Sequence, residues 1–503
     1  MTNVKNSEHS FSHDEIIRRF EEAKGKTLGE IDVTGVFSGK PKNKGVAGAV
    51  IEQSVLGYPP DSRQEPDIEI DGLPYEVKTT GLIFGAKKRK QRGEEKSPLK
   101  RGEKKDLEAK EPMSITAVSV DDIWKEDFSD SAFWHKLDHM LVAYYLYNGG
   151  SPTKVDGPME YASFPVIGYE LHRWDDDDKA VLAADWQLVR DFVARVHEEG
   201  LDPDEEYPKI SHELNRKLLY TDTSPKWPNK PRWRLKRSTV SAMVREHFTG
   251  DLEHLPTLLS SYDDIESECR SLRHDYAGAT IAELAKELRY DGLLTGKSIA
   301  ERIVVRMFGG HSKKMSRLDA FAKAGIQCKT ITYSNGEVKL AEDIKFARVD
   351  FDEAMDETAL WEGSVAQEGF TGRILCAIFE EPSKEAPLSE NVFKGFKWIE
   401  FDDMVVEEAR SVWNEVRRLI FSGELRDVIC RRKDGSPIIN KTGVPKSAPN
   451  FPKSEDAYAV FIRGDGRDST KKPLRINGID MYLQYFWLKR CWVVQSLKAA
   501  DFI

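Results

Sequence analysis

Two acidic residues and a lysine stand close together in the segment Asp-Ile-Glu-Ile-Asp-Gly-Leu-Pro-Tyr-Glu-Val-Lys, which runs from Asp67 to Lys78. Apolar residues alternate with charged ones on both sides of an Asp-Gly turn, and this spacing predicts a β-hairpin. Residues two apart on a strand share a face, so Glu76 and Lys78 lie together, and Asp67 reaches that face from across the turn. Carboxylates bind hard cations, and a nearby ammonium positions a water or a phosphate. The segment therefore predicts a Mg²⁺ site for phosphodiester hydrolysis, with Asp67 and Glu76 as ligands.

The acid-x-Lys pattern also has an ordinary interpretation. It also occurs elsewhere in this chain, for example at Glu22, Glu103, Glu108 and Glu337. A solvated strand or helix face explains such a tripeptide equally well. The role of Glu52 also has two interpretations, because this residue borders the apolar stripe of a helix expected to begin at Lys44. It is either a glutamate at the edge of that stripe or a member of the acidic site.

Length and composition limit the class of protein. A chain of 503 residues is expected to form at least two domains. With 40% hydrophobic and 32% charged residues it is expected to be a soluble cytoplasmic protein with no membrane partner. The five cysteines show no C-x-x-C spacing and are expected to be buried thiols, not a zinc site or a disulfide framework. A net charge of −10 argues against indiscriminate coating of nucleic acid, but it permits a local basic groove.

The remaining pattern of the first half predicts an α/β arrangement. Ser12 is a candidate N-cap of an amphipathic helix, and Lys87–Lys110 is expected to be a mobile loop or, alternatively, a flap that contacts phosphates. The other expected elements are a strand at Ser114–Val120, a helical or irregular piece at Ser131–Asp138, a buried strand at Met140–Tyr147, a helix at Asp185–His197 and a helix from about Ser238.

A segment rich in tryptophan and basic residues, 225–237, precedes that last helix. Its composition suits contact with phosphates and base edges, and the alternative is a surface loop held by its tryptophans. The candidate DNA-binding residues are Arg232, Arg234, Lys236 and Arg237, of which the two arginines are the candidates for reading bases.

The second half of the chain repeats the first at an offset of about 252 residues. Thr280 to Glu283 repeats Thr27 to Glu30, Asp319 falls in the place of Asp67, and Lys329 falls in the place of Lys78. The acidic residues are not repeated, because Gln327 replaces Glu76 and Val304 replaces Glu52. An amide and an alkyl group do not substitute for carboxylate ligands, so the second copy is expected to be catalytically inactive.

The second copy keeps the aromatic and basic segment, in which Lys489 and Arg490 follow Trp487. Loss of the ligands with retention of this segment predicts a DNA-binding domain. The expected organisation is a catalytic domain at residues 1–255 and a pseudo-nuclease domain at 256–503.

Several motifs, taken in order, resemble those of the MutH-like endonucleases. They are Thr27-Leu28-Gly29-Glu30, Lys44-Gly45-x-x-Gly48-x-x-x-Glu52, Asp67, Glu76-x-Lys78-Thr79 and His135-Lys136-Leu137. The family contains a mismatch-repair nicking enzyme and type II restriction enzymes that cut at GATC. The resemblance implies two tandem restriction-endonuclease-like domains of the PD-(D/E)xK class, each with a mixed central sheet flanked by helices, the second degenerate.

The resemblance also implies roles for individual residues. Asp67 and Glu76 would hold Mg²⁺, Lys78 would position or help deprotonate the attacking water, and Glu52 would complete the acidic cluster. Lys44 and Gly45 would lie in a loop facing DNA, and His135 with Lys136 would approach the phosphates.

The sequence is thus expected to encode a Mg²⁺-dependent type II restriction endonuclease of double-stranded DNA. Its second domain is expected to bind a second copy of the site as an effector, with dimerisation on DNA possible. The alternatives are a mismatch-repair nicking enzyme with an extra domain, a DNA-binding regulator without activity, and an unrelated α/β protein that arose by duplication.

Overall fold

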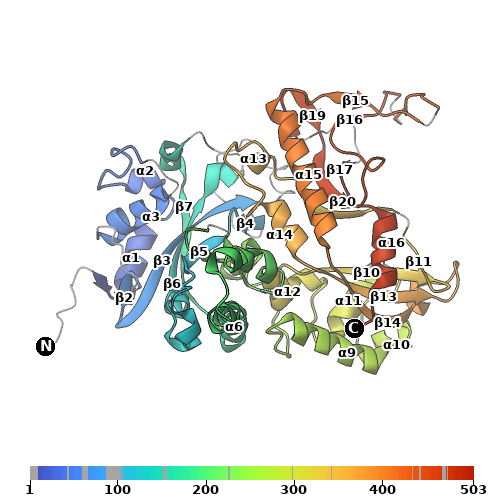
Figure 1. Ribbon diagram of the computed structural model, residues 1–503, viewed down its shortest axis with the longest axis horizontal. Coiled ribbons are helices and arrows are strands. Elements are labelled where there is room, and N and C mark those ends of the chain that lie inside the picture. The colour runs from blue at the N-terminus through green and yellow to red at the C-terminus, as the bar shows by residue number, and fades with distance from the viewer. Residues whose placement is uncertain are drawn as a thin grey trace. The chain divides into compact units, whose positions relative to one another are not determined.

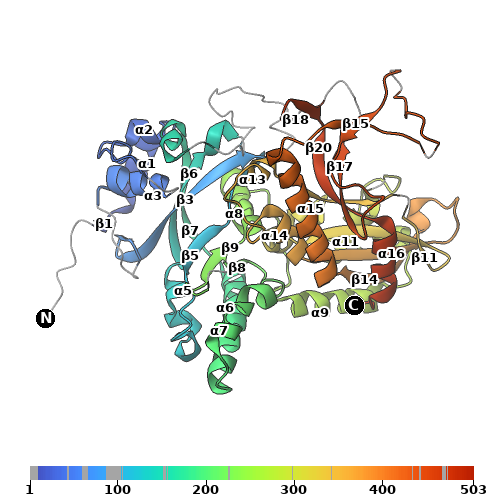
Figure 2. The same ribbon diagram turned by 45° about the horizontal axis from the view of Figure 1, so that its top comes forward.

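A computed structural model describes residues 9–41, 45–58, 66–85, 104, 106–150, 155, 157–224, 227–296, 298–340, 342–432, 434–440, 443–466, 472 and 474–503. The chain forms two compact units (Figures 1 and 2). Unit 1 contains Met1–Ile265 and Arg317–Gly325, and unit 2 contains Glu266–Ser316 and Ile326–Ile503. The return of 317–325 to the first unit was not expected from the sequence.

Unit 1 is built on a mixed sheet in the order β1-β2-β3-β6-β7, with β4 also paired to β3. Strand β3 runs parallel to β6, and the β2–β3 and β6–β7 pairs are antiparallel. The strands are β1 (Ser10–Phe11), β2 (Ile68–Ile70), β3 (Leu73–Phe84), β4 (Leu107–Ala109), β6 (His139–Leu146) and β7 (Val166–Arg173). A smaller sheet has the order β5-β9-β8, from β5 (Met113–Ala117), β8 (Thr221–Ser224) and β9 (Arg232–Leu235).

The predicted hairpin is confirmed. Strands β2 and β3 pair from Ile68 with Tyr75 to Ile70 with Leu73. The turn residues Asp71 and Gly72 have φ of 48° and 82°, the left-handed region that Gly and Asp tolerate best in a two-residue hairpin turn. Strand β3 continues past Lys78, which makes it the longest strand of unit 1 and the frame of its sheet.

Helices cover both faces of this sheet. The helices of unit 1 are α1 (His13–Ala23), α2 (Leu28–Ile31), α3 (Val46–Val50) with a π-helical continuation at Ile51–Leu56, α5 (Ala132–His135), α6 (Asp176–Glu198), α7 (Pro203–Glu206), α8 (Arg237–Thr249) and α12 (Asp319–Ala324). Ser12 caps α1 by accepting a hydrogen bond from the Glu15 amide, as predicted. The apolar sides of α1 and α3 pack with Val77 and Ile83 of β3 in one core, whereas α8 contacts β4.

The predicted loop at Lys87–Lys110 is wrong at its end. Leu107–Ala109 forms β4 and pairs antiparallel with Leu82–Phe84, because Leu107 and Ala109 alternate with Glu108 and are buried. The remainder of the predicted loop, apart from residues 104, 106 and 110, lies outside the described residues.

Unit 2 contains a sheet of order β11-β10-β13-β14 and a second of order β12-β20-β17. The strands are β10 (Gln327–Ser334), β11 (Glu337–Val338), β12 (Ile344–Arg348), β13 (Ile374–Glu381), β14 (Val392–Ile399), β17 (Val460–Asp465) and β20 (Leu483–Leu488). Two hairpins are added by β15 (Asp427–Ile429) with β16 (Ser447–Pro449) and by β18 (Leu474–Ile476) with β19 (Ile479–Met481). Its helices are α9 (Tyr262–Tyr276), α10 (Ile281–Glu287), α11 (Ile299–Met307), α13 (Phe351–Ala354), α14 (Val365–Thr371), α15 (Asp403–Phe421) and α16 (Arg490–Ala499).

The two units share one internal plan. In unit 2, β10 is parallel to β13 and β13 antiparallel to β14, as β3, β6 and β7 are in unit 1. Thr27 and Thr280 both form complete capping boxes with the glutamate three residues later. Gly25 donates to the Val166 carbonyl of β7 at 2.7 Å, and Gly278 donates to the Phe393 carbonyl of β14 at 2.9 Å. The repeat in the sequence thus has a counterpart in backbone geometry.

The expected copy of the hairpin between Asp319 and Lys329 is wrong. Asp-Ala-Phe-Ala-Lys-Ala forms the helix α12, which ends at Gly325 with φ of 69°. Alanine-rich sequence with a following glycine favours a helix and its C-cap over a strand. The Asp319 carboxylate lies in the first turn of this helix, 2.9 Å from Lys323 Nζ. It is therefore not the strand-edge carboxylate that its alignment with Asp67 suggested.

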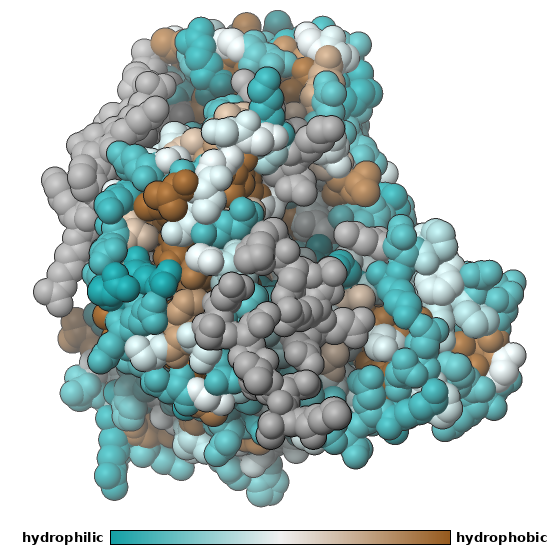
Figure 3. All heavy atoms as spheres, turned by 90° about the vertical axis from the view of Figure 1, so that its left-hand side faces the viewer, coloured by the Kyte–Doolittle hydropathy of each residue, from teal (hydrophilic) through white to brown (hydrophobic). Residues whose placement is uncertain are grey.

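The composition predicted a protein without membrane spans and with buried, unpaired cysteines, and the structure bears on both predictions. Among the described residues, no helix has both the length and the apolar content needed to span a membrane. Viewed from the side of α1 to α3, the visible surface is mostly hydrophilic, with hydrophobic residues in small groups (Figure 3). All five cysteines are free, but Cys491 is exposed and only Cys269 and Cys376 are fully buried.

Candidate active site

Asp67 stands at the open edge of β3. The β2–β3 pairing ends at Ile68, and Asp67 Oδ2 then accepts a hydrogen bond of 2.8 Å from the Val77 amide. The Asp67 carboxylate thus accepts the hydrogen bond that a backbone carbonyl of β2 would accept if the pairing of β2 with β3 continued. His9 Nδ1 donates to the Asp67 carbonyl at 2.8 Å. Both ends of Asp67 are therefore fixed beside Glu76.

Glu76 is the most buried acidic residue of the site, with 4% exposure. Lys78 Nζ lies 2.7 Å from Glu76 Oε1, which confirms that the two residues share a face of β3. Lys136 Nζ lies 2.9 Å from Oε2. Two ammonium groups hold the Glu76 carboxylate, so, with Asp67 beside it, the site combines two carboxylates with two ammonium groups.

Lys136 reaches Glu76 because of the parallel pairing of β3 and β6. Glu76 is paired with Met140 near the start of β6, and Lys136 ends the short helix α5 just before that strand. Parallel neighbours begin at the same edge of a sheet, so the residues that lead into β6 meet the start of β3. The sequence predicted Lys136 as a phosphate contact and missed this ion pair. The sequence does hold one indication of this ion pair: Lys136 comes only a few residues before the buried strand predicted from Met140.

Burial raises the pKa of Asp67, and the negative charge of Glu76 raises it further. Two carboxylates held together away from water repel each other, and a divalent cation relieves that repulsion. Their oxygen donors suit a hard cation such as Mg²⁺. The oxygen donors of Asp67 and Glu76 thus suit a divalent cation chemically, and their role as ligands stays a prediction. No group of three His, Cys, Asp or Glu side chains among the described residues is arranged to bind a metal.

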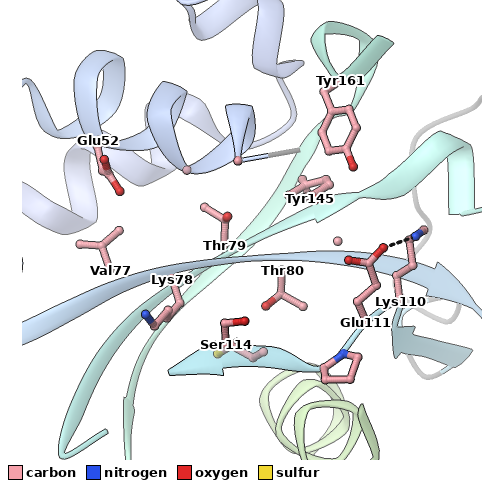
Figure 4. Close-up of a pocket in the computed structure, with 15 residues that line it drawn as sticks. Glu52, Val77, Lys78, Thr79, Thr80, Lys110, Glu111, Ser114, Tyr145 and Tyr161 are labelled. Atoms are coloured by element: carbon pink, nitrogen blue, oxygen red, sulfur yellow. Dashed lines mark hydrogen bonds and ion pairs between the residues drawn. The ribbon is translucent and has the colours of Figure 1, made fainter. Parts of the chain in front are cut away.

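Glu52 borders the same region from the other side of β3. A hollow of about 290 Å³ lies along the open edge of β3, lined by residues that include Glu52, Lys78, Thr79 and Tyr145. In Figure 4, Glu52 descends from its helix toward the face of β3 that carries Thr79, whereas Lys78 projects from the opposite face. Glu52 is thus at the hollow, but the structure does not group it with Asp67 and Glu76.

The loop and helix residues predicted to face DNA are placed only in part. Lys44 lies outside the described residues, and Gly45 precedes α3 at the rim of the hollow. His135 is exposed at the end of α5. Helix α3 packs close to β3 at Gly48, where an added Cβ would lie 3.8 Å from Thr79 Oγ1 and 3.9 Å from Glu52 Oε1, within ordinary van der Waals contact.

Most of the basic residues in the predicted DNA segment have internal partners. Arg234 forms a two-point ion pair with Asp222, with nitrogen–oxygen distances of 2.7 and 2.8 Å. Lys236 is 8% exposed and donates to the Leu218 carbonyl at 2.5 Å. Arg237 donates to the Ala109 carbonyl at 2.7 Å. These contacts favour a structural role for all three, and Arg232 is the exposed member of the set.

The corresponding lysine of unit 2 repeats this contact. Lys489 Nζ donates to the Ala457 carbonyl at 2.6 Å, and Arg490 is exposed at the start of α16. Lys236 and Lys489 each precede a helix and follow the last strand of a three-stranded sheet. Their match in sequence thus reflects a shared way of closing that sheet, and DNA contact by Lys489 stays a prediction.

Comparison with known proteins adds to this geometry. The family described as DNA mismatch repair enzyme MutH matches residues 56–182, a range that contains Asp67, Glu76, Lys78, His135 and Lys136. The chain is also 21% identical over 530 aligned residues to the type II restriction enzyme Sau3AI of Staphylococcus aureus, covering 95% of this chain and 97% of that protein. The similarity to the restriction enzyme thus extends through both units.

Proposed function

We propose that this chain, a MutH-like restriction endonuclease by its sequence relationships, hydrolyses phosphodiester bonds of double-stranded DNA with Mg²⁺ at the Asp67–Glu76 pair. One observation carries the proposal. Asp67, Glu76, Lys78 and Lys136 come from three separate stretches of chain and meet at one edge of β3, with both ammonium groups on the Glu76 carboxylate. The two ammonium groups balance the two carboxylates, so the positive charge that a bound Mg²⁺ ion would add suits a site that receives phosphate.

The protein residues divide the work of hydrolysis. Asp67 and Glu76 would hold the Mg²⁺ ion, and the bound ion would lower the pKa of its water and offset charge on the phosphate. Lys78 is anchored by one hydrogen bond to Glu76, and its remaining N–H groups can orient a water or a phosphate oxygen. Lys136, held on the other oxygen, would fix the orientation of the Glu76 carboxylate. The hollow beside Thr79 leaves space for the DNA strand.

The proposed substrate is a short specific site, with GATC suggested only by the family. The domains proposed are a catalytic one at 1–255 and a degenerate pseudo-nuclease at 256–503, in which Gln327 and Val304 stand in place of Glu76 and Glu52. The second domain would bind another copy of the site as an effector, and two chains would meet on DNA to cut both strands. A substrate with two sites should then be cut faster per site than a substrate with one.

A mismatch-repair nicking enzyme is the second candidate, because the matching family carries that description. The two functions differ in product. A nicking enzyme converts supercoiled plasmid to open circles, and a restriction enzyme continues to linear fragments. The similarity to a type II restriction enzyme over nearly the full length favours the second outcome.

The test is cleavage of unmethylated plasmid with Mg²⁺ by Glu76→Gln. We expect loss of cleavage with retained DNA binding. Glu337→Gln is a matched control, because Glu337-Val-Lys339 is the same tripeptide as Glu76-Val-Lys78 but is exposed in unit 2 and pairs with Lys498. Wild-type cleavage by Glu76→Gln would refute the site, and a protein that binds DNA without ever cutting it would support the regulator instead.

A further inference from the structure

Unit 2 contains an insertion that unit 1 lacks. Between the long helix α6 and strand β8, unit 1 has residues 199–220, whereas unit 2 has residues 422–459 between α15 and β17. The described part of residues 427–449, which is 427–432, 434–440 and 443–449, is paired as a β-ribbon, and we call this segment the ribbon. Strands β15 and β16 pair antiparallel at its base, and bridges from Arg431 to Pro437 and from Ile439 to Pro445 continue the pairing outward.

The ribbon is anchored in the core of unit 2. Asn450 accepts a hydrogen bond from the Arg426 amide at 2.9 Å and donates to the Glu424 carbonyl at 3.2 Å, which closes the base. Leu425 and Phe451, on either side, are 6% and 3% exposed. Beyond this base, the segment labelled β15 and β16 in Figure 1, and β15 in Figure 2, extends away from β17 and β20. The ribbon is therefore a defined arm, not an irregular loop.

Positive charge is concentrated on this arm. Residues 427–449 contain five Lys or Arg against two Asp, in a chain whose net charge is −10. Both aspartates are occupied, because Asp434 accepts from Ser436 at 2.6 Å and Asp427 accepts from Ser447 at 2.5 Å. A basic arm on an acidic protein marks where a polyanion is attracted.

Two of these cations are available for a partner. Arg432 and Lys446 are exposed, and the described part of the chain offers neither side chain an ion pair. Ile439 and Val444 lie beside them with 48% and 59% exposure. Exposed apolar side chains next to basic ones suit the sugar edges and floor of a DNA groove, into which a two-stranded β-ribbon fits.

We propose that the ribbon at residues 427–449 binds double-stranded DNA along a groove, with Arg432 and Lys446 on the phosphates. The inference rests on the proposed function and adds to it a contact surface that belongs to unit 2 alone. The ribbon holds the DNA that unit 2 binds, and it takes no part in hydrolysis at β3.

The test measures binding of the full-length Glu76→Gln protein to a duplex that contains the site, without cleavage. We compare Arg432→Gln/Lys446→Gln with Lys286→Gln/Lys384→Gln, which removes the same charge from exposed lysines elsewhere in unit 2. We expect the ribbon variant to bind about tenfold more weakly at 0.1 M salt and its log Kobs–log[salt] slope to fall by about 1.8, at about 0.9 per lost phosphate contact. The control pair should change both quantities little.

A second variant tests the ribbon as a whole. Ile429 and Ser447 are paired across the base, so residues 430–446 can be replaced by an Asn-Gly turn. We expect an unchanged thermal midpoint with weakened DNA binding. If the parent protein binds the duplex and the folded ribbon variants bind it equally well, the ribbon inference is wrong. If the parent itself does not bind DNA, the proposed function fails first.

Discussion

Lys136 Nζ lies 2.9 Å from Glu76 Oε2, although the two residues are 60 positions apart in the chain. This contact links the start of β6 to the start of β3 and places a second ammonium at the site. Glu76 would otherwise be a buried carboxylate paired with Lys78 alone.

We expect Lys136→Met to reduce cleavage by about 100-fold, the usual effect of removing one charge-stabilising donor from an active site. Glu76 would lose a cation and attract Mg²⁺ more strongly, so the Mg²⁺ concentration for half-maximal rate should fall. Lys125→Met is the control, because Lys125 is exposed and pairs with Asp122 on the preceding helical turn. Single-turnover cleavage across a Mg²⁺ titration measures both effects. An unchanged rate would show that the ion pair serves only folding.

Asp67→Asn is expected to abolish cleavage and to stabilise the metal-free protein. The pKa of Asp67 is raised by burial and by Glu76, so its folded-state pKa lies above its unfolded one. The ionised carboxylate therefore destabilises the fold at neutral pH, and the variant should melt at a higher temperature. This difference should shrink as the pH falls through the folded-state pKa and vanish below the unfolded value. Melting curves from pH 7 to pH 3.5 test it, and a variant that melts lower at pH 7 would contradict it.

Substitutions at Arg232 and at Lys236 should have different effects, the first on DNA binding and the second on stability. Lys236 is buried on the Leu218 carbonyl and lies near Asp185, which accepts three backbone amides at Leu219, Tyr220 and Thr221. Lys236→Met should lower the free energy of unfolding of unit 1 by about 3 kcal/mol, because it leaves the buried Asp185 charge uncompensated. Arg232→Gln should leave stability unchanged and weaken DNA binding severalfold. Denaturant titration and fluorescence anisotropy on both variants give the answer. Equal melting of the two would refute the structural role of Lys236.

Restoring the missing acids in unit 2 should not restore activity. In the Glu76→Gln background, Val304→Glu and Gln327→Glu would rebuild two of the carboxylates that the repeat has lost. We expect no cleavage, because Asp319 lies in the first turn of α12 and is bound to Lys323, so no strand-edge carboxylate precedes β10. Plasmid cleavage above the Glu76→Gln level would show that unit 2 retains a complete site.

Much of the site could be predicted from the sequence, because its geometry depends on residues that are close together in the chain. Strand period places Glu76 beside Lys78, the Asp-Gly turn returns the chain, and Ser12 caps its helix at the predicted residue. These features depend on neighbours within a few positions, so composition and spacing suffice. The repeat was visible for the same reason, since the capping box at Thr280 is also local.

Local rules failed where a residue's partner lies far along the chain. Nothing near Asp319 in sequence shows that it forms a helix within unit 1, and nothing near Lys236 shows that it is buried. The same Lys and Arg side chains serve in DNA contacts and in internal ion pairs, and only their burial in the folded protein distinguishes the two roles. Figure 4 makes the same point for Glu52, which reaches β3 from the face opposite Lys78.

The sequence by itself determined the hairpin, the identity of Asp67, Glu76 and Lys78 as a unit, and the loss of acids from the second copy. The tertiary structure decided that Lys136 completes the site and that Arg234, Lys236 and Lys489 have internal partners. The physical reason is the range of each interaction. Strand period and turn geometry are set by adjacent residues, whereas the partner of a charged side chain is set by how distant strands pair.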